Sequence, residues 1–376
     1  FLDDLRHAQV LIHVVDSSGS TDENGKETKN YDPINDIEWL RSEIHSWIFS
    51  NLLKKWPGIL RRQMVAKAAP ITVFQEIMSG YGANRRVIVR TLNRMDGLRI
   101  DVSNEEAGEL EIPGYTRPPG KDTATVAQSS SKGLSFVNWT KKHLHVFVSV
   151  FLDERFPTVI ALNKIDRPEA DRNIARILRK YGTQVSGQQP LDGIRPENIV
   201  LTSALSECFL KKMEQQGFVR YSPGDDDFLT NDDDPALKPL DDRIKDRLED
   251  VRDLVLFRYG STGTQEAIVR AVEALGMIPV FPVLSISNFG GSHGGGDKIA
   301  GAPSESGASG TGGGAFVDCV LVRRGTTVRE FAKIIGGNID RYYAGAETVG
   351  NIQLGENEPI VLEKNNIISF KTTLAK

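Results

Sequence analysis

Three apolar runs of the chain each lead into polar or small side chains that can bind a ligand. The runs are rich in β-branched residues and read as buried parallel strands: Val10–Asp16, Thr158–Lys164 and Asn198–Ala204. In an open α/β sheet the carboxyl ends of such strands form one ligand-binding crevice. The candidate side chains at those ends are Asp16, Asn163, Lys164, Asp166, Ser203 and Ala204.

These residue types suit a purine base. A carboxylate accepts two hydrogen bonds at once, which matches the adjacent ring N–H and amino group of guanine and mismatches the edge of adenine, so Asp166 is expected to read the base. We expect Asn163 to tie the base to a neighbouring loop, and the alkyl stem of Lys164 to cover the ring face. Backbone N–H groups near Ser203 and Ala204 are expected to bind the guanine carbonyl.

The N-K-I-D motif alone is short and occurs by chance, and a capped strand-to-helix turn also explains it. The preceding apolar strand favours the nucleotide interpretation. So does the T-S-A motif, because Ser203 lies forty residues after Asn163 and ends a second strand.

The strands alternate with helical patterns. Predicted helices cover Glu169–Tyr181 and Leu205–Gln216, and the order strand, helix, strand, helix is typical of a doubly wound α/β sheet. More than a hundred residues separate Asp16 from Thr158, far more than a compact βαβ unit needs. Helical patterns in this interval predict an inserted helical subdomain, with helices starting at Asp32-Pro33 and then covering Ile59–Ala69, Ile71–Ser79 and Asn84–Met95.

The remainder of the chain predicts a second domain. An acidic loop and two helices, Asp242–Tyr259 and Thr264–Leu275, precede a small mixed β-sheet crossed by one helix. A Gly/Ser-rich tract at 290–314 has no apolar period and is expected to be disordered. The predicted organisation is a first G-domain part at 1–30, a helical insertion at 31–137, a second G-domain part at 138–276 and a small β domain at 277–376.

Composition limits the class of protein. The net charge of -4 and the pI near 6.0 give no global nucleic-acid signature. The two cysteines are too few for a disulfide framework and favour a reducing compartment. No apolar run approaches the ~20 residues of a membrane span, so the sequence predicts a soluble, cytoplasmic protein with no membrane partner. It does not determine the oligomeric state.

The phosphate-binding half of a nucleotide site is absent from the sequence. No G-x-x-x-x-G-K-[ST] loop occurs, because "GYTRPPGKD" at Gly114 has the wrong spacing and "GGSHGGGDKI" has no hydroxyl after its lysine. Either phosphate binding was lost or the chain begins downstream of the loop. We expect the second, because the first visible strand lacks the neighbour that carries such a loop.

Several segments together resemble the Obg-like, YchF-type P-loop GTPases. They are "FLDDLRHAQVLIHVVDSSGSTDENGKETKNYDPINDIEWLRSEIHSWI", the N-K-I-D and T-S-A motifs, "FRYGSTGTQEAIVRAVEALGMIPVFPV" and the C-terminal unit. The resemblance implies GTP as ligand, Mg²⁺-dependent hydrolysis, a phosphate loop and Mg²⁺ ligands upstream of Phe1, and a C-terminal TGS domain of β-grasp fold associated with RNA and the ribosome. It assigns neither a catalytic residue nor a metal ligand within this chain. Asp166 resembles the GTP-type branch rather than the members that carry N-M-x-E and prefer ATP.

Basic residues predict a second kind of partner. Between Leu52 and Arg99 the chain has ten basic residues and only two acidic ones. Arg86, Arg90 and Arg94 repeat every four residues on one predicted helix and would form a stripe along it. We expect this stripe to contact rRNA or tRNA, although a solvated helix face is the ordinary explanation. Arg323 and Arg324 are further RNA candidates, and a turn with a helix N-cap at Thr326 or Thr327 explains their segment equally well.

The sequence therefore predicts a GTP-hydrolysing, ribosome- or RNA-associated switch. The alternative is a non-hydrolysing RNA- or ribosome-binding adaptor with a degenerate G domain. An intact Walker loop in the upstream sequence would favour the switch.

Overall fold

The computed structural model describes residues 2–22, 25–66, 68–98, 136, 139–182, 194–287, 289 and 318–373. They belong to two compact units, Phe1–Ala271 and Val272–Lys376. The Gly/Ser tract at 290–314 and most of the predicted insertion after residue 98 lie outside the described residues.

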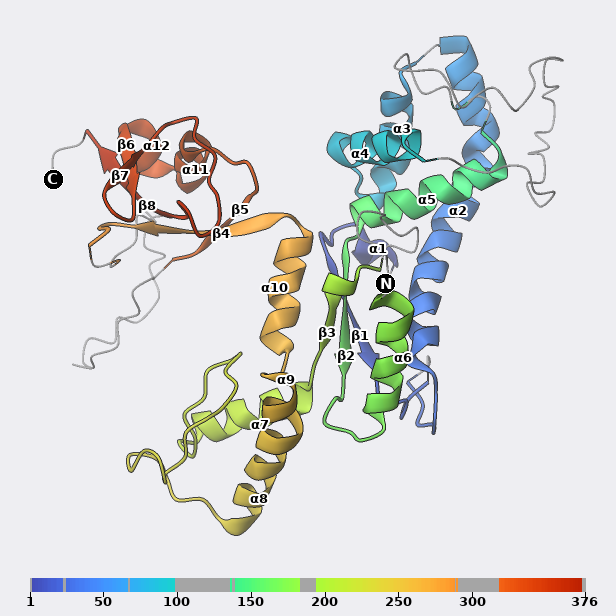
Figure 1. The fold of residues 1–376 in the computed structure, drawn as a ribbon. Coiled ribbons are helices and arrows are strands. Elements are labelled where there is room, and N and C mark those ends of the chain that lie inside the picture. Colours follow the sequence, from blue (N-terminus) through green and yellow to red (C-terminus); the bar gives the residue numbers. More distant parts are fainter. Residues whose placement is uncertain are drawn as a thin grey trace. The chain divides into compact units, whose positions relative to one another are not determined.

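Three parallel strands form the sheet of the first unit (Figure 1). They are β1 (Leu11–Asp16), β2 (Thr158–Asn163) and β3 (Ile199–Leu201), in the spatial order β1-β2-β3. Leu11 pairs with Thr158 and Ile160 pairs with Ile199. The prediction of three parallel strands is confirmed, and their carboxyl ends lie at one edge.

Helices cover both faces of this sheet, as the α/β prediction requires. Alternate residues of β2 separate the two faces: Ile160 and Leu162 pack with helix α6 (Ala170–Gly182) and Ile37, whereas Val159 and Ala161 pack with Ala267 and Ala271 of α10 (Thr264–Ala274).

Strand β1 departs from the predicted burial. Ile12 and Val14 are 43% and 60% exposed. They pair with Val159 and Ala161 of β2 and so share the face on which α10 packs. The interpretation of β1 as a buried strand is therefore wrong for this face, because the α10 side chains pack against β2 and β3.

Four helices and a 3₁₀ turn form the helical part of the same unit: α2 (Pro33–Ala66), α3 (Pro70–Met78), η1 (Ser79–Tyr81), α4 (Arg85–Asp96) and α5 (Lys141–Arg155). Their core includes Trp56, Phe74 and Phe147, each fully buried. Helix α2 runs unbroken through Pro57, where the sequence predicts a separate helix from Ile59. A proline inside a helix costs about 3 kcal/mol, which burial of Trp56 and its neighbours offsets.

Helix α5 belongs to this helical core by its packing. Leu144, Phe147, Phe151 and Leu152 are all in the cluster formed with α2, α3 and α4. The predicted boundary at residue 137 assigned this segment to the second part of the G domain instead.

The remaining elements of the first unit are short helices. They are α1 (Leu2–Leu5), the 3₁₀ turn η3 (Pro196–Asn198), α7 (Ala204–Gln215), α8 (Asp242–Val251), the π-helical segment η4 (Arg252–Leu256) and α9 (Phe257–Tyr259). The last three form the single helical stretch that the sequence predicts over Asp242–Tyr259, with a π-helical interruption. Phe228 and Tyr221 anchor the acidic loop to α7 and α8 through a small buried cluster.

The second unit is a mixed sheet packed against a helix. Its elements are β4 (Met277–Val283), β5 (Val320–Arg323), α11 (Val328–Ile335), α12 (Gly337–Arg341), β6 (Tyr343–Thr348), β7 (Ile352–Leu354) and β8 (Ile367–Thr372). The strand order is β5-β4-β8-β6-β7, with β4 and β8 parallel and the other pairs antiparallel. Phe331 of α11 is fully buried against this sheet.

None of the helices in the described ranges combines the length and apolar character that a membrane span needs.

Candidate functional site

The carboxyl ends of the three parallel strands bring the sequence-predicted residues together. Asp16 pairs in register with Asn163, and Leu162 pairs with Leu201. Beyond the strands the Ile165 N–H donates to Thr202 O at 3.3 Å, and the Thr202 N–H donates to Leu162 O at 2.8 Å. The N-K-I-D turn is therefore bonded directly to the T-S-A turn.

Two side chains of the N-K-I-D turn bond to the T-S-A turn. Asn163 Oδ1 accepts the backbone N–H of Ala204 at 3.0 Å. Asp166 Oδ1 accepts the hydroxyl of Ser203 at 2.7 Å, and this serine is fully buried. Within the part of the chain that the structure describes, Asp166 Oδ2 forms no hydrogen bond.

Ser203 begins helix α7 and is fixed from two sides. Its hydroxyl accepts the Ser206 N–H at 3.2 Å, which caps the helix, and its own N–H donates to Thr262 O at 2.9 Å. Gly263 follows at φ +72°, and a Cβ there would lie 1.8 Å from Leu201 O. Only glycine allows this approach of the Thr262 segment to the end of β3.

Lys164 and Asp16 form an ion pair between the ends of β1 and β2. Lys164 Nζ lies 2.8 Å from Asp16 Oδ2 and donates to the Ser20 hydroxyl at 2.9 Å. The Asp16 side chain is 9% exposed and that of Lys164 is 35% exposed. Lys164 has φ +68°, a left-handed conformation that costs a residue with a side chain of order 1 kcal/mol or more. Such strain points to a functional constraint.

Hydroxyl groups that follow β1 complete the coordination of Asp16. Oδ1 accepts the N–H and the hydroxyl of Ser18, at 3.0 and 2.6 Å, and Oδ2 accepts the hydroxyls of Ser20 and Thr21, at 2.8 and 2.7 Å. Burial alone would raise the pKa of Asp16, but the hydrogen bonds from Lys164, Ser18, Thr21 and Ser20 hold that pKa well below its ordinary value. Asp16 is therefore a charged carboxylate with all its acceptor positions used.

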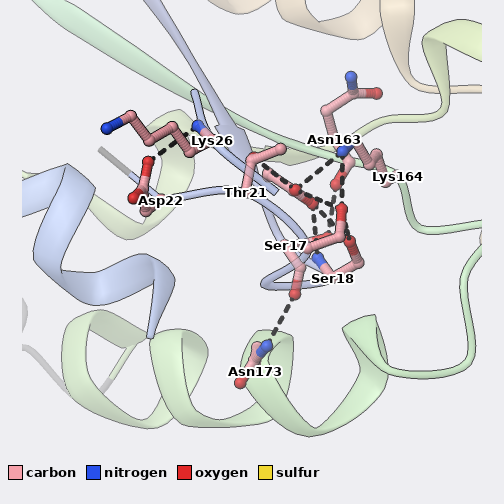
Figure 2. Close-up of polar contacts among 10 residues, drawn as sticks. Ser17, Ser18, Thr21, Asp22, Lys26, Asn163, Lys164 and Asn173 are labelled. Atoms are coloured by element: carbon pink, nitrogen blue, oxygen red, sulfur yellow. Dashed lines mark hydrogen bonds and ion pairs between the residues drawn. The ribbon is translucent and has the colours of Figure 1, made fainter. Parts of the chain in front are cut away.

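Sequence reasoning missed this serine- and threonine-rich loop, which Figure 2 shows around the end of β2. Ser17 donates both its N–H and its hydroxyl to Asn163 O, at 3.0 and 2.6 Å, and Asn173 Nδ2 donates to Ser17 O at 2.9 Å. The signal was present in the sequence, because D-S-S-x-S-T places four hydroxyls within five residues of a strand-ending carboxylate.

The arginine stripe on α4 divides into exposed and paired members. Arg86 is exposed, and the Arg90 side chain is 59% exposed with Glu154 at 3.8 Å. The Arg94 side chain is only 14% exposed, and its guanidinium lies 2.9 Å from Asp153 and 3.7 Å from Glu154. The prediction of Arg94 as an RNA contact is corrected, because α5 packs over the end of the stripe and Arg94 joins the two helices.

Arg323 and Arg324 lie where β5 ends, and both are exposed. The turn that follows has Gly325 at φ +88°, and Thr327 then caps α11. Thr327 Oγ1 accepts the Glu330 N–H at 3.3 Å, and Glu330 Oε2 accepts the Thr327 N–H at 2.9 Å. The structure thus shows the predicted turn and cap, and leaves both arginines on the surface.

His143 and His145 have packing roles on α5. His143 Nδ1 accepts the Thr140 N–H at 3.2 Å at the start of the helix. The ring of His145 stacks on Phe49 with centroids 3.7 Å apart. Burial lowers the pKa of both histidines.

The chain is similar to proteins named as GTP-binding proteins. Residues 161–285 match the family "Obg-like GTPase YGR210-like, G4 motif-containing domain". A protein of Schizosaccharomyces pombe named as an uncharacterized GTP-binding protein is 38% identical over the whole chain, which spans 75% of that relative. A second protein so named, from Methanocaldococcus jannaschii, is 28% identical over 98% of the chain and 75% of its own length.

A solved structure has the same fold. The crystal structure of a GTP-binding protein from Pyrococcus horikoshii OT3 superposes with a TM-score of 0.62 at 26% identity, covering 99% of this chain and 81% of that one. The family match at residues 161–285 contains the N-K-I-D and T-S-A turns. The similarity to the Schizosaccharomyces pombe relative extends over both units. The chain therefore belongs to the Obg-like family of GTP-binding proteins.

Proposed function

We propose that the edge formed by the N-K-I-D and T-S-A turns binds the guanine base of GTP. The observation that carries this proposal is the position of Asp166, whose Oδ1 is held by the buried Ser203 hydroxyl. A carboxylate fixed in this way presents an acceptor edge that matches the ring N–H and amino group of guanine. An adenine ring would leave these acceptors unpaired, which is costly in a partly buried site.

Asn163 and Lys164 take supporting roles in this proposal. The stem of Lys164 covers one face of the base, while its ammonium is bonded to Asp16 and Ser20. The two backbone donors expected to bind the guanine carbonyl are both engaged, the Ser203 N–H by Thr262 and the Ala204 N–H by Asn163. Binding of the guanine carbonyl at Ala204 therefore requires Asn163 Oδ1 to release or share that N–H.

The proposed activity is Mg²⁺-dependent hydrolysis of GTP. Phosphate transfer of this kind needs backbone donors around the phosphates and a metal ion bridging them. The residues that supply these groups, and the residue that orients the attacking water, lie outside the described residues in this proposal. The chain's own contribution is to bind and orient the base.

The decisive experiment is a competition titration of the natural full-length protein with a fluorescent GTP analogue and Mg²⁺. We expect GTP to displace the probe far better than ATP. Asp166→Asn should lower the affinity for GTP by about 100-fold or more, since the amide cannot accept both guanine hydrogen bonds. Glu169→Gln, an exposed carboxylate three residues further along the chain, is the matched control and should bind like the wild type.

Equal competition by GTP and ATP would contradict guanine recognition. GTP binding without hydrolysis would support the adaptor alternative instead.

The proposed partner of the protein is the ribosome or another structured RNA, and with it a cytoplasmic location. Arg86 and Arg90 project from α4, and Arg323 and Arg324 lie exposed on the smaller unit. We also propose that this smaller unit is a β-grasp module of the TGS type, because a mixed five-stranded sheet packs against the single longer helix α11.

Charge reversal tests the RNA surface. The double variant Arg86→Glu with Arg90→Glu should weaken co-sedimentation with ribosomes and reduce the salt dependence of binding by about one unit of slope per arginine. Asp96→Lys at the end of the same helix changes the charge in the opposite direction and should not weaken co-sedimentation. An unchanged salt dependence in the double variant would rule out this surface.

A further inference from the structure

We infer that Asp16 is a positioning residue for guanine-nucleotide binding, which it performs by holding Lys164. This inference rests on the proposed function. Base recognition by Asp166 does not involve Asp16 or the hydroxyl-bearing loop that follows it.

The side chains of Asp16 and Lys164 meet at the ends of two neighbouring strands. Asp16 and Lys164 are 148 residues apart in the chain, and their side chains meet because β1 and β2 are in register at Asp16 and Asn163. A free lysine side chain has four rotatable bonds and about 2 kcal/mol of rotamer entropy. Bonding its ammonium to both Asp16 and Ser20 restricts that freedom before a ligand arrives.

The carboxylate of Asp16 is held in its charged form by hydrogen bonds. Four of its five hydrogen bonds come from the loop Ser18–Thr21, through one backbone N–H and three hydroxyls, and the fifth comes from Lys164. These donors keep the carboxylate ionised and immobile in a nearly buried position. The ammonium of Lys164 therefore has a fixed, negatively charged partner in Asp16, beside the Ser20 hydroxyl.

The loop around Asp16 is also bonded to the N-K-I-D turn, which is proposed to bind the base. Ser17 is bonded twice to the carbonyl of Asn163, so the loop is attached to the N-K-I-D turn at two successive residues. The left-handed backbone of Lys164 is strained, and the ion pair compensates part of that cost. The loop and the turn thus form one preorganised support, and a preorganised site binds more tightly because less freedom is lost on binding.

Dissociation of a fluorescent GDP analogue from the natural full-length protein tests the inference through a double-mutant cycle. Asp16→Asn should dissociate about tenfold faster than the wild type, because a charge-assisted contact is lost. Lys164→Met keeps most of the apolar stem but removes the ammonium, and should show a similar change. The double variant should dissociate no more than about twofold faster than either single variant, since both remove the same contact.

A second readout separates positioning from loss of structure. Inosine diphosphate lacks the amino group that Asp166 is proposed to bind. Asp16→Asn should leave the ratio of GDP to inosine diphosphate affinity unchanged, whereas Asp166→Asn should reduce it. Asp22→Asn is the matched control, because Asp22 lies in the next turn of the loop and its Oδ1 accepts the Lys26 N–H at 2.9 Å.

If Asp16→Asn fails to fold, Ser20→Ala replaces it in the cycle. That change removes one donor to Asp16 and one acceptor of Lys164, so it should accelerate dissociation a few-fold in the wild type and have no effect in Lys164→Met. Additive effects in either cycle, or a changed GDP to inosine diphosphate ratio in Asp16→Asn, would overturn the inference alone. Failure of the wild type to bind the GDP analogue would overturn both the inference and the proposed function.

Discussion

Two carboxylates of the larger unit, Asp16 and Asp153, face similar surroundings and respond in opposite ways. Their side chains are 9% and 6% exposed, and each lies within ion-pair distance of a basic group. Burial raises the pKa of Asp153 more than the nearby Arg41 and Arg94 lower it. At Asp16 burial also raises the pKa, but Lys164 and the hydroxyl donors outweigh it and the pKa is lowered.

A neighbouring cation alone does not decide whether the pKa of a buried carboxylate is raised or lowered. Asp153 joins α2, α4 and α5, and its charge is balanced by two long arginine side chains that reach it from neighbouring helices. Asp16 receives a backbone N–H and three hydroxyls from its own loop, each directed at one oxygen. At Asp153 the loss of hydration on burial outweighs the direct contacts of both arginines, whereas at Asp16 the five hydrogen bonds to the charged form outweigh it.

The largest expected effect comes from breaking the Asp153 network. Arg94→Ala should lower the free energy of unfolding of the larger unit by about 3 kcal/mol, because it leaves a nearly buried carboxylate with one cation fewer. Tryptophan fluorescence during urea unfolding measures this unit, since all four tryptophans of the chain lie before Ala271. Arg86→Ala on the same helix is the matched control and should change stability by less than about 0.5 kcal/mol. Equal losses for the two variants would show that Arg94 does not join the helices.

A smaller effect is the pH dependence of the free energy of unfolding, which should have opposite signs for the two carboxylates. A lowered pKa, as at Asp16, contributes stability that is present above the ordinary value of 3.8 and is lost as the pH falls through the folded pKa. A raised pKa, as at Asp153, does the reverse, because the folded state binds the proton more tightly and loses stability as the pH rises.

The stability difference between wild type and Asp16→Asn should therefore shrink as the pH falls below about 4. The difference between wild type and Asp153→Asn should shift in favour of the wild type in a higher pH range, as the pH falls through the raised folded pKa toward the ordinary value of 3.8. Urea unfolding at a series of pH values measures both. Slopes of the same sign would mean that the two sites do not differ in the way proposed.

The smallest expected effect comes from removing one donor of several. Thr21→Val deletes one hydroxyl bond to Asp16 Oδ2 and should cost about 1 kcal/mol of unfolding free energy. The remaining four bonds keep Asp16 charged, so nucleotide dissociation should change by less than about twofold. A loss as large as that of Asp16→Asn would indicate that the loop acts as an all-or-none unit rather than as a sum of donors.

Much of the site was predictable because its signals are local. Asn163, Asp166, Ser203 and Ala204 were expected together, since each ends an apolar run and parallel strands place such ends at one edge. A helix N-cap at Thr326 or Thr327 was one of two explanations that the sequence left open, and the structure shows it at Thr327, where Glu330 completes the capping box. By contrast, the unbroken passage of α2 through Pro57 was not expected, because burial of residues far apart in the sequence overrode a local helix breaker.

The amino-acid sequence by itself determined the approximate positions of the three strands, where most of the main helices begin, and that Asp166 closes the N-K-I-D motif. These are properties of short segments, in which apolar spacing and turn chemistry act within a few residues. Only the tertiary structure decided that Asp16 bonds to Lys164 and that Arg94 bonds to Asp153 while Arg86 stays exposed. Arginines spaced four residues apart all lie on one face of a helix, so the spacing does not distinguish them. Which of them is buried depends on where a helix distant in the sequence packs.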